Sequence, residues 1–559
     1  MVRSSYYLNI FLVIILPFSC TTRQQESTVV QDGVISIIPM PVNIERLKGN
    51  FSINPGTKIF AQQGNQEILN IANRLAEQIE TASGMIIPVA QVEDVGTSVR
   101  AIFISLDPQV DLGSEGYRLS IQETGISIKA SEPAGLFYGV QTLLQLLPAE
   151  IKSHSPIQGI NWTVPAVEIE DYPRFQWRGL HLDVARHFMP VEFIKEYIDN
   201  MAMHKLNTFH WHLTEDQGWR LEINKYPRLT EVGAWRKETL MGHYNDQPHQ
   251  FDGQRHGGYY TQDEVREIVQ YAKDRYITIV PEIEMPGHAK AAIAAYPELG
   301  VTGEKVEVGT FWGIFPDIFN VEDATFKFLE DVLTEVMELF PGEYIHVGGD
   351  EAIKDQWEAS ERIQQQIKEL GLKDEHELQS YFITRIEKFL NANGRKLIGW
   401  DEILEGGLAP NAAVMSWRGT EGGIAAAKSG HFVVMSPGTH VYFDHYQVDP
   451  GKEPLAIGGY TTLEKVYQFE PTPEELNSEE QQYILGAQAN VWTEYMPTPE
   501  HVEYMVFPRV SALAEVVWST KEKRNWNNFK ERIPKQLKRY EYRGINYAKV
   551  PLDLPLEAK

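Results

Sequence analysis

The chain of 559 residues carries 77 acidic and 51 basic side chains, which gives a formal net charge of −26 at pH 7. An acidic surface repels phosphate backbones, so nucleic-acid binding as a general function is disfavoured. Hydrophobic residues make up 43% and charged residues 23% of the chain, a composition typical of globular proteins and unlike that of collagen-like or disordered chains. The length predicts more than one domain.

The first 33 residues have the pattern of an export signal followed by a tether. Arg3 precedes an apolar run over 10–16, which is too short to span a bilayer, and Cys20 follows it. Because Cys20 is the single cysteine, an intrachain disulfide and a cysteine-based zinc site are impossible. A small residue before Cys20 resembles a bacterial lipoprotein cleavage site. We therefore predict a signal peptide over 1–20, a lipidated Cys20 and a polar tether over 21–33.

This prediction places the protein in the bacterial cell envelope, periplasmic or anchored in the outer membrane, with the lipid as its only membrane contact. Lipoprotein signals usually have leucine three residues before the cysteine, whereas Pro17 stands there and Leu16 lies one residue earlier. Secretion without a lipid anchor therefore stays an alternative.

Residues 34–170 predict a small α+β domain. Strands are expected over 58–61, 85–89 and 101–105, and a hairpin over 117–121 and 125–129 that turns near 123–125. One helix is expected around 68–79, where apolar residues recur on one helical face, and a second over 134–146. The segment contains no obvious catalytic constellation.

From residue 171 to the end at 559, strand-like runs alternate with helical stretches. The runs cover residues 179–183, 208–212, 277–282, 344–347, 396–400, 413–417, 432–435 and 484–488. Eight alternating units predict a closed (β/α)8 barrel of the TIM type, and the remaining residues form its carboxyl-terminal tail. Active sites on such barrels lie at the carboxyl ends of the strands.

Carboxylates and tryptophans follow several of these runs, a combination that suggests a sugar ligand. Asp350 and Glu351 are the sharpest feature, because they come directly after a buried strand and two glycines. Neighbouring Cα atoms lie only about 3.8 Å apart. A separate acid and nucleophile on a sugar ring need about 5–5.5 Å for retention and 6.5–9.5 Å for inversion. We therefore expect one of the two to serve as acid/base and the other to orient a nucleophile that the substrate supplies.

Six segments of the chain form a distinctive set: Arg178-Gly-Leu-His-Leu-Asp183, His210-Trp-His-Leu-Thr-Glu-Asp216-Gln-Gly-Trp219, Pro286-Gly-His288, His346-Val-Gly-Gly-Asp-Glu351, Gly399-Trp-Asp-Glu402 and Trp492-Thr-Glu494. Together they resemble the family-20 glycoside hydrolases, the β-N-acetylhexosaminidases, over roughly residues 37–518. The resemblance implies a retaining exo-hydrolase that removes terminal β-linked GlcNAc or GalNAc from oligosaccharides or glycoconjugates. It implies substrate-assisted catalysis through an oxazolinium intermediate, without a cofactor or a metal.

The resemblance also implies roles for individual residues. Glu351 would be the acid/base and Asp350 the group that stabilises the oxazolinium, with His288 supporting the acid/base and Tyr442 binding the acetamide carbonyl. Trp400, Trp417 and Trp492 are expected to enclose the acetamide group. Arg178, Asp444 and Glu494 are expected to bind the sugar hydroxyls.

Two other functions stay open at this point. His210 and His212 would lie on the same side of a strand, a pattern of metal-dependent amidohydrolase barrels, with Asp216 and His288 as further ligands. The alternative reading of the two histidines is that they are packed, hydrogen-bonded core residues. A non-enzymatic glycan-binding lipoprotein would need aromatic residues but not Asp350 and Glu351.

Overall fold

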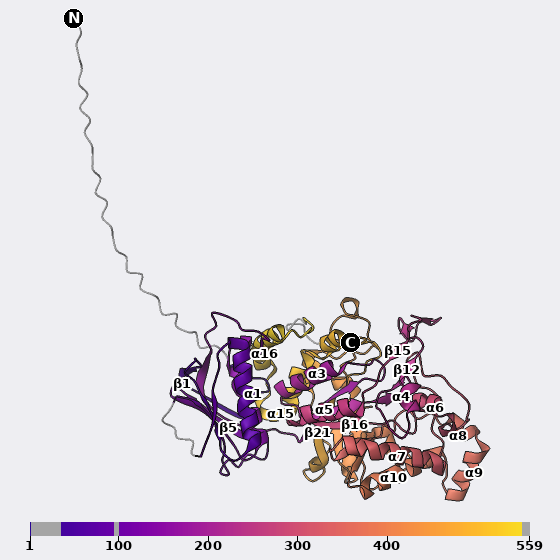
Figure 1. The fold of residues 1–559 in the computed structure, drawn as a ribbon. Helices are drawn as coiled ribbons and strands as arrows, with labels where there is room; N and C mark the ends of the chain where they lie inside the picture. The colour runs from indigo at the N-terminus through magenta and orange to yellow at the C-terminus, as the bar shows by residue number, and fades with distance from the viewer. Residues whose placement is uncertain (2–34, 94–99, 550–559) are drawn as a thin grey trace. The chain divides into compact units, whose positions relative to one another are not determined.

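The computed structural model in Figure 1 describes residue 1 and residues 35–93 and 100–549. The predicted signal peptide, Cys20 and the tether over 21–33 lie outside the described residues. From Ser36 onward the chain forms one compact unit, in which a mixed sheet precedes a closed barrel. The predicted fold class, a small α+β domain followed by a (β/α)8 barrel, is confirmed. Within the described ranges, every helix is too short or too polar to cross a membrane.

The amino-terminal domain is built on a seven-stranded sheet with the strand order β1-β7-β5-β6-β4-β2-β3. The strands are β1 (Asn43–Ser52), β2 (Ile59–Gln62), β3 (Val89–Val92), β4 (Ile102–Leu106), β5 (Tyr117–Gln122), β6 (Gly125–Ala130) and β7 (Thr163–Asp171). The predicted hairpin is confirmed, since β5 and β6 pair antiparallel. The strand expected over 85–89 begins only at Val89, where its pairing with Ile59 of β2 starts.

Two helices of this domain, α1 (Gln66–Ser83) and α2 (Pro133–Leu146), pack on the sheet. α1 begins at Asn65, whose side chain accepts two backbone N–H groups of the first turn, and ends at Gly84 with φ 73°. Its buried face contains all the apolar residues that the sequence pattern predicted. α1 lies on the side of the sheet nearer the barrel (Figure 1), where its Arg74 pairs with Asp274 at 2.9 Å.

Eight parallel strands close the barrel in the order β8-β9-β16-β17-β18-β19-β20-β21. They are β8 (Trp177–Asp183), β9 (Thr208–His212), β16 (Thr278–Glu282), β17 (Tyr344–His346), β18 (Lys396–Trp400), β19 (Ala413–Ser416), β20 (Val433–Met435) and β21 (Ile484–Ala489). β8 and β9 are buried along their whole length, as expected for parallel strands covered on both faces. All eight runs recognised in the sequence therefore form barrel strands, with small shifts at their ends.

Helices surround this barrel. The longer ones are α3 (Val191–Met203), α5 (Gln262–Lys273), α7 (Asp323–Leu339), α9 (Glu361–Leu370), α10 (Glu375–Ala392), α11 (Glu421–Lys428), α14 (Pro499–Val506), α15 (Arg509–Trp518) and α16 (Trp526–Arg543). The shorter ones are α4 (Arg228–Glu231), α6 (Lys290–Ala295), α8 (Asp355–Ala359), α12 (Gly438–Val441) and α13 (Leu463–Gln468).

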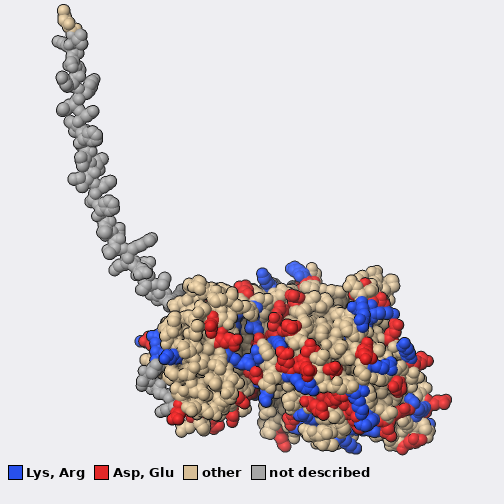
Figure 2. Space-filling model, in the orientation of Figure 1, with Lys and Arg blue, Asp and Glu red and all other residues tan. Residues whose placement is uncertain are grey.

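The loop between β9 and α5 carries six short strands. They are β10 (Thr214–Glu215), β11 (Gly218–Trp219), β12 (Trp235–Arg236), β13 (Leu240–Met241), β14 (Gln250–Phe251) and β15 (His256–Gly257). Figure 2 shows acidic and basic side chains intermingled on the face in view, over both domains.

Candidate active site

The loop after β17 carries the two adjacent acids. Gly348 has φ 64° and Gly349 has φ 94°, values that disfavour residues with a side chain. A Cβ atom on Gly348 would also lie 1.7 Å from Glu284 Oε2, so a larger residue there would have to displace the Glu284 side chain. This turn presents Asp350, whose side chain is 13% exposed, next to Glu351, whose side chain is 33% exposed. Glu351 is thus the more accessible of the two acids.

His288 lies beside both acids. Its Nε2 is 3.6 Å from Asp350 Oδ2 and 3.6 Å from Glu351 Oε2. On the other side of the ring, Nδ1 lies 2.8 Å from Glu215 Oε1 and 3.2 Å from Asp216 Oδ2. Burial alone would lower the pKa of His288, but Glu215 and Asp216 raise it well above its ordinary value. His288 is therefore a cation with an N–H directed at the pair of acids.

Glu215 connects His288 to a second cation. Its Oε2 lies 3.2 Å from Arg186 Nη2, while Oε1 faces His288. Although burial alone would raise the pKa of Glu215, Arg186 and His288 hold it well below its ordinary value. No role was predicted for Glu215 or Arg186 from the sequence. Their positions just after β8 and β9, at the carboxyl ends of the strands, are the signal that could have identified them.

Asp350 is largely buried and lies close to other ionisable groups. Burial raises its pKa to about 7; His288 opposes this shift, and the neighbouring Glu351 adds to it. Its Oδ1 is buried and has no hydrogen-bond partner among the described residues. A buried carboxylate oxygen of this kind gains free energy from a donor, such as an amide N–H, that a ligand brings.

The predicted aromatic residues come together next to Asp350. Trp417 and Trp492 pack against the buried cluster that contains Trp400, and the centroids of Trp400 and Trp492 are 5.7 Å apart. Tyr442 stacks on Trp417, with centroids 6.2 Å apart and an angle of 22° between the ring planes. Burial and the charge of Asp444 raise the pKa of Tyr442 well above its ordinary value, so its hydroxyl stays protonated. The four rings come from the ends of β18, β19, β20 and β21.

Asp444 and Glu494 lie close enough to interact through their charges. Burial and Glu494 raise the pKa of Asp444, and burial raises that of Glu494 against the opposing effect of Arg186. Asp444 Oδ1 and Glu494 Oε2 are buried and have no hydrogen-bond partner among the described residues. Arg186 lies over the Trp492 ring, 5.1 Å from its centroid. Two acceptors and one guanidinium donor can thus meet vicinal hydroxyls beside the aromatic pocket.

Arg178 is not part of this site, and its assignment to the sugar hydroxyls was wrong. It is the second residue of β8, at the opposite end of the barrel from Asp183. Its fully buried guanidinium pairs with Glu115 of the amino-terminal domain at 2.7 Å and donates to the backbone carbonyls of Phe175 and Lys205. Five residues of strand at about 3.3 Å each separate it from the carboxyl end. Arg186 has the position and chemistry that were expected of Arg178.

Among the described residues, His210 and His212 fall in different groups of possible metal ligands, His210 with His181 and Glu282, and His212 with Glu215 and Glu284. Glu282 contacts both imidazoles and also accepts a hydrogen bond from Trp400 Nε1 at 2.8 Å. Burial lowers the pKa of His210 to about 4, whereas Glu282 raises the pKa of His212 to about 10 against the opposing effect of burial. The two histidines are buried, paired core residues, and Glu282 holds the Trp400 ring in place.

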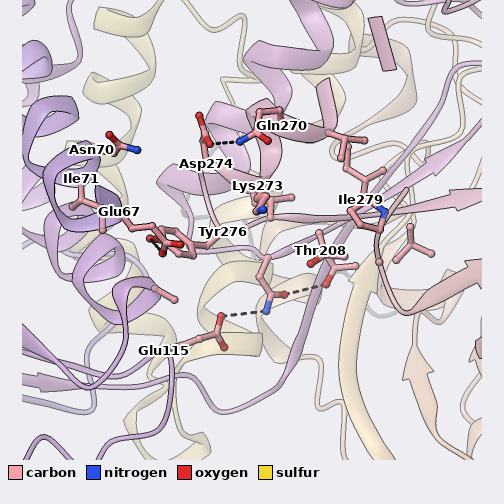
Figure 3. Close-up of a pocket in the computed structure, with 18 of the residues that line it drawn as sticks. Glu67, Asn70, Ile71, Glu115, Thr208, Gln270, Lys273, Asp274, Tyr276 and Ile279 are labelled. Atoms are coloured by element: carbon pink, nitrogen blue, oxygen red, sulfur yellow. Dashed lines mark hydrogen bonds between the residues drawn. The ribbon is translucent and has the colours of Figure 1, made fainter. Parts of the chain in front are cut away.

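A wide cleft of about 1240 Å³ lies elsewhere, between α1 and the amino-terminal ends of the barrel strands. Figure 3 shows Glu67 and Asn70 of α1 on one side and Thr208 and Ile279 of the barrel on the other. Glu115, the partner of Arg178, also lines it. None of the residues predicted for the active site lines this cleft.

Comparison with known proteins identifies the family of the chain. The model of the glycosyl hydrolase family 20 catalytic domain matches residues 175–521, and the model of domain 2 of that family matches residues 34–172. A β-hexosaminidase of Porphyromonas gingivalis is 47% identical over 532 residues, which cover 95% of this chain and 66% of that protein. A β-hexosaminidase of Vibrio furnissii is 35% identical over 512 residues, covering 90% of this chain and 80% of that protein.

A solved structure shares the fold. A mutant Streptomyces plicatus β-hexosaminidase in complex with its product GlcNAc superposes with a TM-score of 0.81 at 31% identity. The match covers 94% of this chain and 98% of that one. The chain therefore belongs to glycosyl hydrolase family 20 and is a glycosidase of the β-hexosaminidase type.

Proposed function

We propose that the protein is a retaining exo-β-N-acetylhexosaminidase that uses the acetamide group of its substrate as the nucleophile. The observation that carries this proposal is the contact of His288 Nε2 with both Asp350 and Glu351 at 3.6 Å, beside a pocket of four aromatic rings. Adjacent acids on one turn are too close to act as acid and nucleophile on opposite sides of an anomeric carbon. A nucleophile from the substrate removes this difficulty.

In the first step, Glu351 protonates the glycosidic oxygen while the acetamide oxygen attacks the anomeric carbon. Asp350 accepts a hydrogen bond from the acetamide N–H and stabilises the positive charge that develops as the oxazolinium ring closes. The Tyr442 hydroxyl donates to the acetamide oxygen and orients it. In the second step, ionised Glu351 takes a proton from a water molecule. The oxygen of that water attacks the anomeric carbon and displaces the acetamide oxygen, so the oxazolinium ring opens. Two inversions at the anomeric carbon retain its configuration.

The substrate pocket is proposed to close around the terminal sugar. Arg186, Asp444 and Glu494 would bind the hydroxyls of a non-reducing end, whether that sugar is GlcNAc or GalNAc. The complex of the Streptomyces plicatus relative with GlcNAc supports a single sugar as the bound unit.

Digestion of a β-1,4-linked GlcNAc oligomer is therefore expected to release single GlcNAc units. Chromatography of early time points should show the monosaccharide together with oligomers shortened by one unit. A wild-type enzyme that produced a mixture of internal fragments from the start would contradict the exo assignment.

Substitution of Arg186 by Lys is expected to lower kcat/KM by about 10- to 100-fold. Lys cannot reproduce the planar fork of donors, and hydrogen bonds to charged groups contribute roughly 1.5–3 kcal/mol. Arg178→Lys provides the matched control, because this buried ion pair lies at the other end of the barrel. That variant should lower the melting temperature and leave kcat/KM close to the wild-type value. A loss of kcat/KM in Arg178→Lys, together with an unchanged kcat/KM in Arg186→Lys, would instead identify Arg178 as the sugar-binding arginine.

We also propose that the enzyme is exported and anchored to the bacterial cell envelope through Cys20. The proposal rests on the sequence of the first 20 residues. Expression in a bacterium with labelled palmitate should label the wild-type protein in the membrane fraction. Cys20→Ala should abolish the label. Secretion of an unlabelled wild-type protein would instead support export without an anchor.

A further inference from the structure

The Trp417 indole contacts a carboxyl group that the proposed mechanism does not use. The indole follows β19 and forms one side of the aromatic pocket, where it stacks on Tyr442. Its Nε1 donates a hydrogen bond of 2.9 Å to Glu402 Oε2. The Glu402 side chain is only 11% exposed. The only strong donor of the Trp417 side chain is thus directed away from the pocket and into a buried acceptor.

The backbone that carries Glu402 is held firmly beside Trp417. Glu402 belongs to the 3-10 helix η3 (Asp401–Leu404), which starts directly after β18. Arg418, the neighbour of Trp417, binds Asp401 at 2.6 Å and Glu405 at 2.9 Å. These contacts tie the ends of β18 and β19 together. Glu402 is the member of this acidic group that reaches the indole.

The protonation state of Glu402 indicates which kind of hydrogen-bond acceptor the indole N–H of Trp417 requires. Burial, together with the charge of Asp350, raises the pKa of Glu402 to about 8. The carboxyl group is therefore largely protonated near neutral pH, and it still offers an oxygen to the indole N–H. A neutral acceptor is sufficient for this contact, and a glutamine side chain supplies one.

We propose that Glu402 is a positioning residue that fixes the ring plane of Trp417, so that the pocket holds the acetamide group in line with the anomeric carbon. The inference rests on the proposed substrate-assisted function. Small errors in the placement of a reacting group lower the rate of the chemical step more than they weaken binding. Loss of the hydrogen bond would leave the partly buried indole without this acceptor and the ring free to tilt.

Three variants test this role: Glu402→Leu removes the acceptor, Glu402→Gln keeps a neutral acceptor, and Glu405→Gln is the matched control. Glu405 contacts the same Arg418 but not the indole. With an aryl N-acetyl-β-glucosaminide, Glu402→Leu should lower kcat by roughly 10- to 100-fold, with a smaller change in KM. The kcat of Glu402→Gln should stay within about threefold of the wild-type value, and the kcat of Glu405→Gln should equal the wild-type value. The affinity for a thiazoline mimic of the cyclised intermediate should fall in Glu402→Leu in parallel with kcat.

Two results would overturn the inference: an unchanged kcat in Glu402→Leu, or a loss in Glu402→Gln as large as that in Glu402→Leu. Should Glu402→Leu not fold, Trp417→Phe removes the same hydrogen bond from the other side and keeps an aromatic ring. An unchanged kcat in that variant would also overturn the inference. If the wild type itself does not cleave the N-acetyl glycoside, the proposed function fails; if it does, a failure concerns Glu402 alone.

Discussion

Replacement of Glu351 by Gln is expected to lower turnover of natural oligosaccharides by about 10²–10⁴-fold, the usual contribution of general acid–base catalysis. A sugar alkoxide is a poor leaving group and needs a proton as the glycosidic bond breaks. Gln has nearly the shape of Glu but cannot supply that proton. Glu351 has the access for this task, because its side chain is one-third exposed and its Oε2 lies 3.6 Å from His288 Nε2.

The leaving group provides the control for this prediction. An activated aryl glycoside leaves without protonation, so the first step of Glu351→Gln should be much less impaired with such a substrate. The comparison requires kcat and kcat/KM for wild type and variant on both substrate types. Equal activity of the two proteins on natural glycosides would exclude Glu351 as the acid.

Replacement of Asp350 by Asn should slow turnover by about 10²–10³-fold, as expected when one preorganised electrostatic contact to a transition state is lost. The shape of the side chain is kept, and its negative charge is removed. Since the charge on the substrate grows only as the oxazolinium ring closes, kcat should fall more than KM rises. A covalent nucleophile at Asp350 would also be sensitive to this change, so the variant alone does not distinguish the mechanisms.

Substrate analogues make that distinction. A glycoside with a hydroxyl in place of the N-acetyl group lacks the internal nucleophile and should be nearly inert, and a thiazoline mimic of the intermediate should inhibit tightly and competitively. Efficient turnover of the hydroxyl substrate, with a glycosyl adduct trapped on Asp350, would refute substrate-assisted catalysis for this protein.

The pH dependence of kcat/KM should report the protonation of the Asp350 carboxyl group. The pKa of Asp350 is raised from 3.8 to about 7, so the carboxyl group gains its proton, and loses its charge, as the pH falls through that value. The kcat/KM of the wild type is therefore expected to decline on the acid side near pH 7, because kcat/KM reports groups of the free enzyme. The residual activity of Asp350→Asn should lack this decline.

Local patterns in the sequence determined much of the fold. The apolar positions of α1 and the hairpin β5–β6 follow from short-range periodicity, and the eight barrel strands from runs of buried residues between helices. The strands β1 and β7 were not predicted. For β1 the reason is that it lies at the edge of the sheet and consists mainly of polar, exposed residues. It therefore lacks the alternation that identifies a half-buried strand. Asp350 and Glu351 could be recognised because the chain itself places them side by side after two glycines.

The partners of these acids were decided by the tertiary structure. The closed barrel brings Glu215, His288 and Glu351 from the ends of three different strands into contact, and it brings Glu402 to Trp417. The same closure separates Arg178 from Arg186, although the two residues are only eight positions apart in the sequence. A motif identifies residue types, whereas the end of the strand on which a side chain lies determines whether it meets substrate or the neighbouring domain. Long-range pairing and burial set the pKa values of these groups, and neither property can be calculated from their neighbours in the chain.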